Sequence, residues 1–239
     1  MRATSDERGR ASSGVPGFDA LVDGGLLPDR LYVLSGPPGS GKTTFSAQFA
    51  AEGIANGESC MYITMHETEE ELRRDMAQFD FDFDRMVDSD GFRFVNLVDK
   101  TGNSLTDPGS NRTGVSALTD KIVAYADSQK VDRLVIDSTM LLDHFFADGE
   151  AEVTQFLTAL KSGSATTLLI SEMTDPSAYA DEHFLAHGVI FFHNFLDSTG
   201  MTRGVQVVKM RGTDVDTEIR PLSFSGAGIR VDPEGEIDV

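Results

Sequence analysis

Hydrophobic residues along this chain fall into short runs that alternate with segments of helical spacing. Short apolar runs bounded by turn residues predict strands buried on both faces of a sheet. A further segment, 91–98, alternates apolar and polar residues as a half-buried strand does. The apolar runs cover residues 31–35, 59–64, 132–138 and 165–171.

Helical segments lie between these predicted strands. Residues 42–55 place Phe45 and Phe49 four positions apart, and apolar residues recur with helical spacing over 115–125 and 153–160. Strand and helix therefore alternate through the first two thirds of the chain. That alternation predicts an α/β fold with a mostly parallel central sheet covered by helices on both faces.

The last third of the chain has a different pattern. Its apolar segments are separated by turns rather than helices. They predict an antiparallel C-terminal extension on the edge of the sheet. The segments are residues 188–196, 204–212, 217–225 and 228–231.

The chain of 239 residues, 40% of them hydrophobic, contains no linker that would divide it. We expect a flexible N-terminal tail over 1–13 and one domain over 14–239. Residues 100–114 hold almost nothing apolar and predict a mobile surface loop. No leader-like segment or apolar run of about 18 residues occurs, so we expect a cytoplasmic protein without membrane contact. The single cysteine, Cys60, lies in an apolar run and is expected in the core.

The net charge of −19 comes from 39 acidic and 20 basic residues. Such a surface repels nucleic acid and anionic membranes unless a local basic patch overrides the mean field. The low lysine content resembles that of halophilic proteins, whose acidic surfaces are screened by high salt. An ordinary acidic protein remains the alternative.

Residues 36–43, GPPGSGKT, match the Walker A pattern GxxxxGK[ST], after a predicted strand and at the start of a predicted helix. Loop glycines let backbone N–H groups turn toward phosphate oxygens. Lys42, expected as an exposed loop residue, can reach the β and γ phosphates, and the Thr43 hydroxyl can ligate Mg²⁺. The predicted ATP-binding residues are Gly36, Pro37, Pro38, Gly39, Ser40, Gly41, Lys42, Thr43 and Thr44.

Asp137 ends the predicted strand RLVID. A carboxylate at the tip of a buried parallel strand commonly holds magnesium in phosphoryl-transfer sites, which is the Walker B role. By itself, an aspartate at a strand end is more often a turn former. The Walker A loop upstream favours Asp137 as a metal ligand.

Residues 65–72, MHETEEEL, follow a predicted strand. Thr68 and Glu71 have the spacing of a capping box, so a helix from about Thr68 accounts for the acids that follow it. Glu67 and His66 precede the cap, at the strand end where open α/β sheets place ligands. These residues alone leave open whether Glu67 and His66 belong to a site.

Lys209 and Arg211 lie in a strand of the tail, on one face because side chains alternate along a strand. Charge on an edge strand often serves only to prevent aggregation. The alternative is a pair of cationic fingers aimed at a γ phosphate.

Taken together, the segments SSGVPGFDALVDGGL, LSGPPGSGKTT, YITMHET, LVIDS, HGVIFF and VKMRGT resemble the KaiC branch of the RecA/RadA superfamily. The resemblance spans nearly the whole chain. It implies a single RecA-type P-loop NTPase domain that binds ATP and Mg²⁺ between neighbouring subunits of a homo-oligomeric ring, for which a hexamer is one possible size. It also implies contacts in trans from Lys209, Arg211 and Gly212.

The chain departs from that family pattern at two positions. In that family, the strand after the P-loop helix usually ends in two adjacent glutamates, one of which polarises the attacking water, and here the pair is His66 and Glu67. The resemblance thus implies Glu67 as the candidate catalytic general base, with Lys42 as a catalytic cation. His66 either tunes Glu67, replaces the missing glutamate poorly, or only packs. Val215 stands where the clock proteins often carry a histidine. Both departures weigh against efficient hydrolysis of ATP.

Three functions follow from these observations. The first is a slow ATPase whose nucleotide-dependent oligomer acts in regulation or signalling, with an unidentified regulatory protein as a partner. The second is an ATP-sensing scaffold without useful hydrolysis. A DNA recombinase paralogue is disfavoured, because residues 137–160 and 172–200 contain no lysine or arginine to neutralise phosphates.

Two other patterns predict no site. His144, His183, His187 and His193 lack a zinc-like spacing and are expected in packing or solvent roles. Residues 79–83, FDFDF, predict a half-buried surface segment rather than a base-stacking platform.

Overall fold

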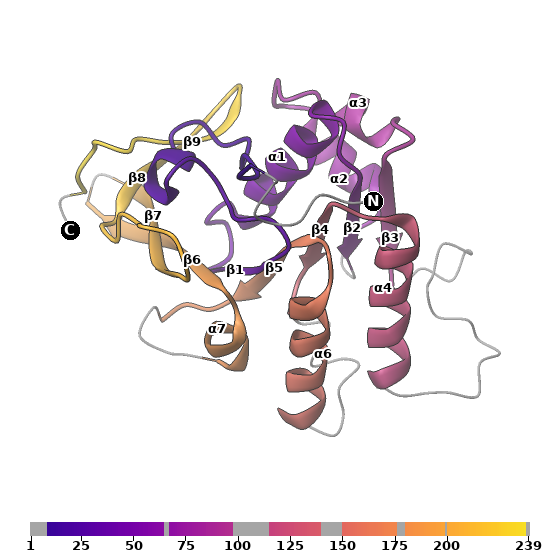
Figure 1. The fold of residues 1–239 in the computed structure, drawn as a ribbon. Helices are drawn as coiled ribbons and strands as arrows, with labels where there is room; N and C mark the ends of the chain where they lie inside the picture. The colour runs from indigo at the N-terminus through magenta and orange to yellow at the C-terminus, as the bar shows by residue number, and fades with distance from the viewer. Residues whose placement is uncertain are drawn as a thin grey trace.

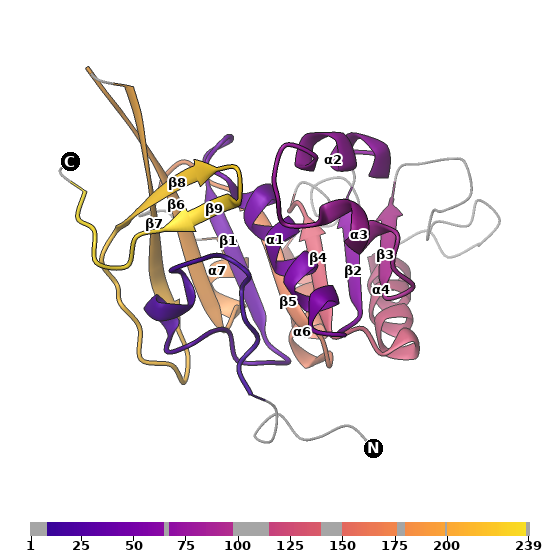
Figure 2. The same cartoon turned by 90° about the horizontal axis from the view of Figure 1, so that it is seen from above.

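A computed structural model describes residues 9–64, 67–97, 115–139, 150–175, 180–198 and 200–237. These residues form a sheet of nine strands in the order β3-β2-β4-β5-β1-β6-β7-β8-β9, with helices on both faces (Figures 1 and 2). The strands are β1 (Leu31–Gly36), β2 (Cys60–Thr64), β3 (Phe92–Asn96), β4 (Arg133–Asp137), β5 (Thr166–Glu172), β6 (Gly188–Asp197), β7 (Gly200–Met210), β8 (Arg220–Ser225) and β9 (Gly228–Val231). The helices are the 3₁₀ turn η1 (Asp19–Val22), α1 (Lys42–Ala55), α2 (Glu69–Met76), α3 (Phe83–Val87), α4 (Val115–Gln129), α6 (Glu150–Ser162) and α7 (Asp181–Leu185).

The predicted division of the sheet is confirmed. Strands β3, β2, β4, β5, β1 and β6 are parallel, and β6 to β9 are antiparallel. Strands β1, β2 and β4 are buried over almost their whole length, as expected for strands with helices on both sides. The carboxyl ends of β1, β2, β4 and β5 therefore lie along one edge of the sheet.

The helices pack in two groups, each over its own hydrophobic core on one face of the sheet. Helices α1, α2 and α3 pack with η1, β8 and β9 on one face, where Phe18, Phe45 and Phe192 make edge-to-face contacts. Helices α4 and α6 cover the other face through Ile122 and Phe156. The figures show the same two layers of helices around the sheet.

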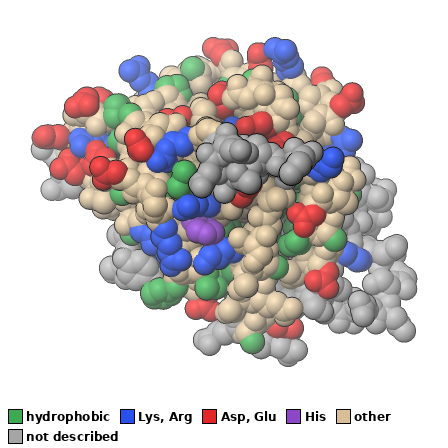
Figure 3. Space-filling model, viewed as in Figure 1, with side chains coloured by type: hydrophobic (Ala, Val, Ile, Leu, Met, Phe, Trp, Pro, Cys, Tyr) green, Lys and Arg blue, Asp and Glu red, His purple; other side chains and the backbone are tan. Residues whose placement is uncertain are grey.

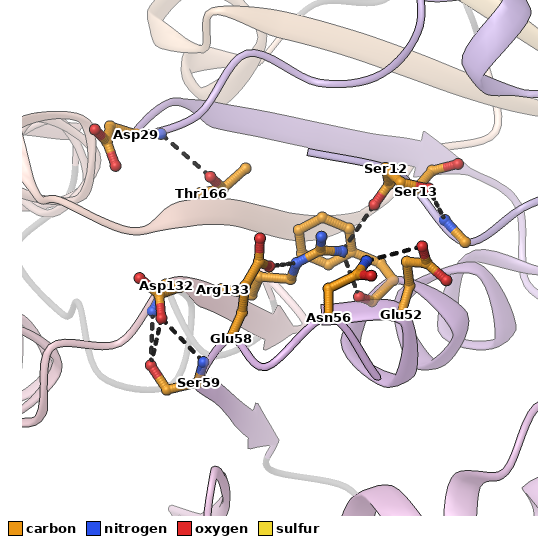
Figure 4. Close-up of polar contacts among 12 residues, drawn as sticks. Ser12, Ser13, Asp29, Glu52, Asn56, Glu58, Ser59, Asp132, Arg133 and Thr166 are labelled. Atoms are coloured by element: carbon orange, nitrogen blue, oxygen red, sulfur yellow. Dashed lines mark hydrogen bonds and ion pairs between the residues drawn. The ribbon is translucent and has the colours of Figure 1, made fainter. Parts of the chain in front are cut away.

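Arg133 joins one end of the sheet to the N-terminal segment (Figure 4). Its side chain is 1% exposed, pairs with Glu58, and donates to the carbonyl oxygens of Ser12 at 2.8 Å and Phe49 at 2.7 Å. Its guanidinium carbon lies 4.4 Å from the centre of the Phe49 ring. A buried cation needs such compensation, and here it fixes α1 against β4.

The N-terminal segment is attached before residue 14. Ala11 forms a bridge with Leu26, and Arg10 donates to the carbonyl oxygens of Val22 and Gly25. The backbone N–H of Ser13 donates to Asp19. Four residues of the segment predicted as a tail, 10–13, thus contact the domain.

Several local predictions have definite outcomes. Thr68 and Glu71 form the predicted capping box at the start of α2, which ends at Met76. Phe79 and Phe81 are half-buried, and Cys60 is buried in β2. The whole of the predicted mobile loop, residues 100–114, lies outside the described residues, as does His144. None of the described helices is long and apolar enough to cross a bilayer.

Candidate functional site: a phosphate loop at the strand ends

The Walker A segment connects β1 directly to α1. The φ values of Gly36, Gly39 and Gly41 are +146°, +72° and +108°, which residues with a side chain rarely adopt. A Cβ on Gly36 would lie 2.4 Å from the carbonyl oxygen of Phe192, and one on Gly41 would lie 2.8 Å from the Ile229 side chain. Glycine is thus required by backbone conformation and by the close approach of β6 and β9.

Lys42 was expected to be exposed, and this expectation was wrong. The residue is only 6% exposed, and its Nζ donates to the carbonyl oxygens of Gly36 at 2.8 Å and Pro37 at 2.9 Å. The loop closes around the ammonium through these two carbonyl groups. Burial lowers the pKa of Lys42, while Glu172 and Asp137 act to raise it.

The predicted Walker A and Walker B residues meet at this edge of the sheet. The Thr43 hydroxyl donates to Asp137 Oδ2 at 3.0 Å, and the Tyr62 hydroxyl donates to the same oxygen at 3.0 Å. Burial, followed by the charges of Asp137 and Glu67, raises the pKa of Tyr62 well above its usual value. Tyr62 therefore acts as a fixed donor that orients Asp137.

A hydroxyl and a carboxylate are hard oxygen ligands of the kind Mg²⁺ prefers. No group of three or more His, Cys, Asp or Glu side chains that could hold a metal occurs in the described part of the chain. Thr43 and Asp137 thus fit a magnesium ion that takes its remaining ligands from phosphate and water, the usual arrangement for this metal.

Glu67 lies on the same side as the phosphate loop. It lines a cavity of about 710 Å³ together with Thr43, Thr44 and Asp75. Burial raises the pKa of Glu67, and the nearby carboxylates of Asp137, Asp75 and Glu71 raise it further. Its backbone carbonyl accepts a hydrogen bond of 2.8 Å from Asn96. His66, the other residue of the predicted pair, lies outside the described residues.

Two residues that the sequence did not single out form the outer wall of the site. The Arg203 guanidinium lies 5.2 Å from the centre of the Phe224 ring, and Arg203 Nε donates to the carbonyl oxygen of Gly39 at 3.2 Å. Phe224, 40% exposed, lines both the 710 Å³ cavity and an adjoining cavity of about 260 Å³ over the phosphate loop. No local pattern marks them, because both reach the site from the antiparallel extension.

Lys209 and Arg211 lie far from the phosphate loop of the same chain. Lys209 lies near the end of β7 and Arg211 directly follows that strand; the two side chains point to one side, as predicted, since both donate to the carbonyl oxygen of Phe184 at 3.2 Å. The Arg211 N–H donates to the carbonyl of His187, whose own N–H donates to the carbonyl of Leu31. The pair therefore sits at the start of β1, whereas the phosphate loop follows its end.

These two cations belong to a larger group, which we call the cation patch: Arg30, Lys161, Lys209 and Arg211 around His187. Figure 3 shows lysine and arginine side chains gathered about a histidine on this face. Burial and then these four cations lower the pKa of His187 to about 4. His187 Nδ1 accepts a hydrogen bond from the N–H of Leu31 at 3.1 Å, so the ring's proton is on Nε2.

The other two described histidines are buried and contact neighbouring side chains. His183 is buried and contacts Ser35, and His193 contacts Gln206 at 3.1 Å and stacks on Phe195. Val215, the position where the clock proteins often have histidine, is half-buried and packs on the core that contains α1.

Comparisons with known proteins agree with this geometry. A circadian clock protein KaiC3 from Synechocystis is 29% identical over 212 residues, covering 86% of this chain and 42% of the relative. The clock oscillator protein KaiC of Parathermosynechococcus lividus is 28% identical over 238 residues, covering 96% of this chain and 43% of the relative. This chain thus spans less than half the length of these relatives.

A solved structure of a KaiC-like protein from the archaeon Pyrococcus horikoshii is similar over nearly its whole length. Its TM-score is 0.78 at 30% identity, and the match covers 94% of this chain and 99% of that one. The family model for the KaiC ATPase matches residues 11–236. The chain belongs to the KaiC family of ATPases.

Proposed function

We propose that this chain binds ATP with Mg²⁺ and hydrolyses it slowly at a site that a second copy completes. The observation that carries the proposal is the contact between Thr43 and Asp137, which brings the two halves of a phosphoryl-transfer site together. The loop glycines allow backbone N–H groups to face phosphate oxygens, and Lys42 exchanges its loop carbonyls for the β and γ phosphates.

The residues around the loop supply the remaining parts. Thr43 and Asp137 would hold Mg²⁺, which neutralises charge on the phosphates. Glu67 orients the attacking water and accepts its proton, and its raised pKa makes it a better base than an ordinary glutamate. Phe224, backed by Arg203, offers the base of the nucleotide an exposed aromatic face.

The cation patch supports a site shared between copies. Lys209 and Arg211 cannot reach the phosphates bound by their own loop, because the length of β1 separates them. In the described part of the chain, none of the four patch cations pairs with a carboxylate, in a protein with a net charge of −19. A phosphate presented by a neighbouring copy suits this patch, and a closed ring would give every subunit the same contact.

The decisive experiment measures phosphate release and oligomeric mass together, with Mg²⁺-ATP and with Mg²⁺-ADP, at low and at high salt. We expect slow turnover and larger particles with ATP. Screening of the acidic surface at high salt should favour assembly if the protein is halophilic. ATP binding without phosphate release would instead identify the ATP-sensing scaffold. A particle that stays monomeric would contradict the shared site.

Regulation or signalling through an unidentified protein partner is the role we assign to the nucleotide-dependent oligomer. Direct DNA binding is disfavoured by the cation-free segments after β4 and β5 and by the acidic surface. Absence of any salt-dependent DNA binding would support this assignment.

A further inference from the structure

Helix α7 lies between the two halves of the proposed shared site. Lys209 Nζ donates to the carbonyl oxygens of His183 and Phe184, and Arg211 donates to that of Phe184. The positions of the two cations are therefore set by the last turn of α7.

The buried side of the same helix contacts the two central strands. Ser171 on β5 donates to Glu182 Oε1 at 2.8 Å, and His183 Nε2 lies 3.1 Å from Ser35 Oγ on β1. His183 Nδ1 accepts the N–H of Ala180 at 2.9 Å, so Nε2 carries the proton and donates to Ser35. Burial lowers the pKa of His183, which keeps the ring neutral for this arrangement.

Ser35 precedes Gly36, the first residue of the phosphate loop, and Ser171 precedes Glu172. They are register partners in the β1–β5 pair, and the next pair is Gly36 and Glu172. The Gly36 carbonyl accepts the hydrogen bond from Lys42, and Glu172 lines the 260 Å³ cavity. Adjacent residues of α7 thus contact β1 one residue before the phosphate loop and β5 one residue before Glu172.

All four side chains of this connection are buried, at 0% to 7% exposure. A buried polar network has few alternative arrangements, because an unpaired donor or acceptor in a low dielectric is costly. In the proposed site, a phosphate takes the place of the Gly36 carbonyl as a partner of Lys42. Any shift of Gly36 that follows is therefore passed on to Ser35, His183 and the end of α7 together. The cations Lys209 and Arg211 rest on that end.

We infer that His183 is a positioning residue that couples the phosphate loop of each subunit to the cations that the same subunit offers to its neighbour. Nucleotide bound at one site then shifts the positions of Lys209 and Arg211, the cation pair that serves the next site. The inference rests on the proposed nucleotide site. Coupling is reciprocal, so changing Lys209 must alter the affinity of its own subunit's phosphate loop, although Lys209 never touches that nucleotide.

The test is a double-mutant cycle on nucleotide affinity. A hydrolysis-resistant ATP analogue with Mg²⁺ is titrated at protein concentrations below those at which the parent assembles, so that no neighbour contributes. We expect Lys209→Met to change the dissociation constant about three- to tenfold in the parent and less than twofold in a His183→Asn background. Asparagine keeps an acceptor for the Ala180 N–H but does not reach Ser35.

Two further variants separate coupling from general damage. His183→Gln places an amide N–H near the original Nε2 position and should restore the effect of Lys209→Met. His193→Asn changes a buried histidine that contacts Gln206 rather than Ser35, and should leave the effect intact. If His183→Asn fails to fold, Ser35→Ala removes the same contact from the strand side.

Equal factors in both backgrounds would overturn the coupling while leaving the nucleotide site standing. A parent that does not bind the Mg²⁺-analogue would overturn the proposed function and the coupling together. Loss of the Lys209→Met effect in the glutamine background as well as in the asparagine background would also contradict the role of the Ser35 contact.

Discussion

The Thr43 hydroxyl donates a hydrogen bond of 3.0 Å to the carboxylate of Asp137, although 94 positions separate the two residues in the chain. Parallel pairing produces this contact, because β1 and β4 both flank β5 and their carboxyl ends share one edge of the sheet. It supplies the geometry on which the predicted nucleotide chemistry depends.

We expect Lys42→Ala to abolish most ATP affinity or turnover. The variant should still fold, with a loss of roughly 1 to 3 kcal/mol in the free energy of unfolding, because two loop carbonyls lose a charged donor. Isothermal titration with Mg²⁺-ATP and urea denaturation measure the two effects separately. Unchanged affinity together with unchanged turnover would refute the phosphate-loop assignment.

Glu67→Gln should stop hydrolysis and preserve ATP binding. The amide has the shape of the carboxylate but cannot accept a proton, and general-base help is worth about 10²- to 10⁴-fold in rate. Phosphate release at saturating Mg²⁺-ATP, with affinity measured in parallel, checks this. Glu70→Gln on the exposed first turn of α2 is the matched control and should leave turnover unchanged. A Glu67→Gln protein as active as the parent would remove Glu67 from the mechanism.

Arg211→Ala should lower turnover and weaken ATP-dependent oligomers without unfolding the subunit, because the residue is exposed and lies away from its own phosphate loop. Mixing this variant with Lys42→Ala should restore part of the activity, since some interfaces then combine an intact loop with an intact arginine. Turnover and mass of the mixtures are the measurements. Arg230→Ala, an exposed arginine on β9, serves as the control, and mixtures without recovery would favour a site within one subunit.

Lys161→Met should raise the pKa of His187 from about 4 toward its ordinary value of 6.5 without reaching it, because burial, the largest cause of the lowered pKa, remains. The folded value lies below the unfolded one, so the unfolded state binds more protons. Stability is therefore lost as pH falls from about 6.5 to 4, and the loss should be smaller in the variant. Histidine NMR titration gives the pKa directly. His193, which lies outside the cation patch, should not move; an unchanged His187 would contradict the electrostatic account of the patch.

Gly53→Ala should destabilise the protein by about 1 to 3 kcal/mol, the usual cost of overpacking. Alanine in a helix is normally favourable, but a Cβ here would lie 2.4 Å from Cδ of buried Arg133. Urea denaturation measures the difference. Gly9→Ala has open space around it and should be neutral. Equal stability of both variants would show that Arg133 can move at no cost.

Features that depend on local spacing, namely the strands, the helices and the short motifs, could be predicted from the sequence alone. Apolar runs and helical periodicity predict the alternation of strands and helices, because burial imposes periods of about 2 and 3.6 residues on each element. A few neighbouring residues are enough to predict each of three features: the phosphate loop, Asp137 at a strand end and the cap at Thr68. Their chemistry could be read before any fold was known.

How these parts face one another depends on the packing of the whole domain. The burial of Lys42, the wall made by Arg203 and Phe224, and the distance of Lys209 from its own phosphate loop depend on strand order and register. The network from Ser35 through His183 to Lys209 joins residues that are far apart in the chain. Strand order arises from the packing of whole faces against one another, so no local pattern carries it.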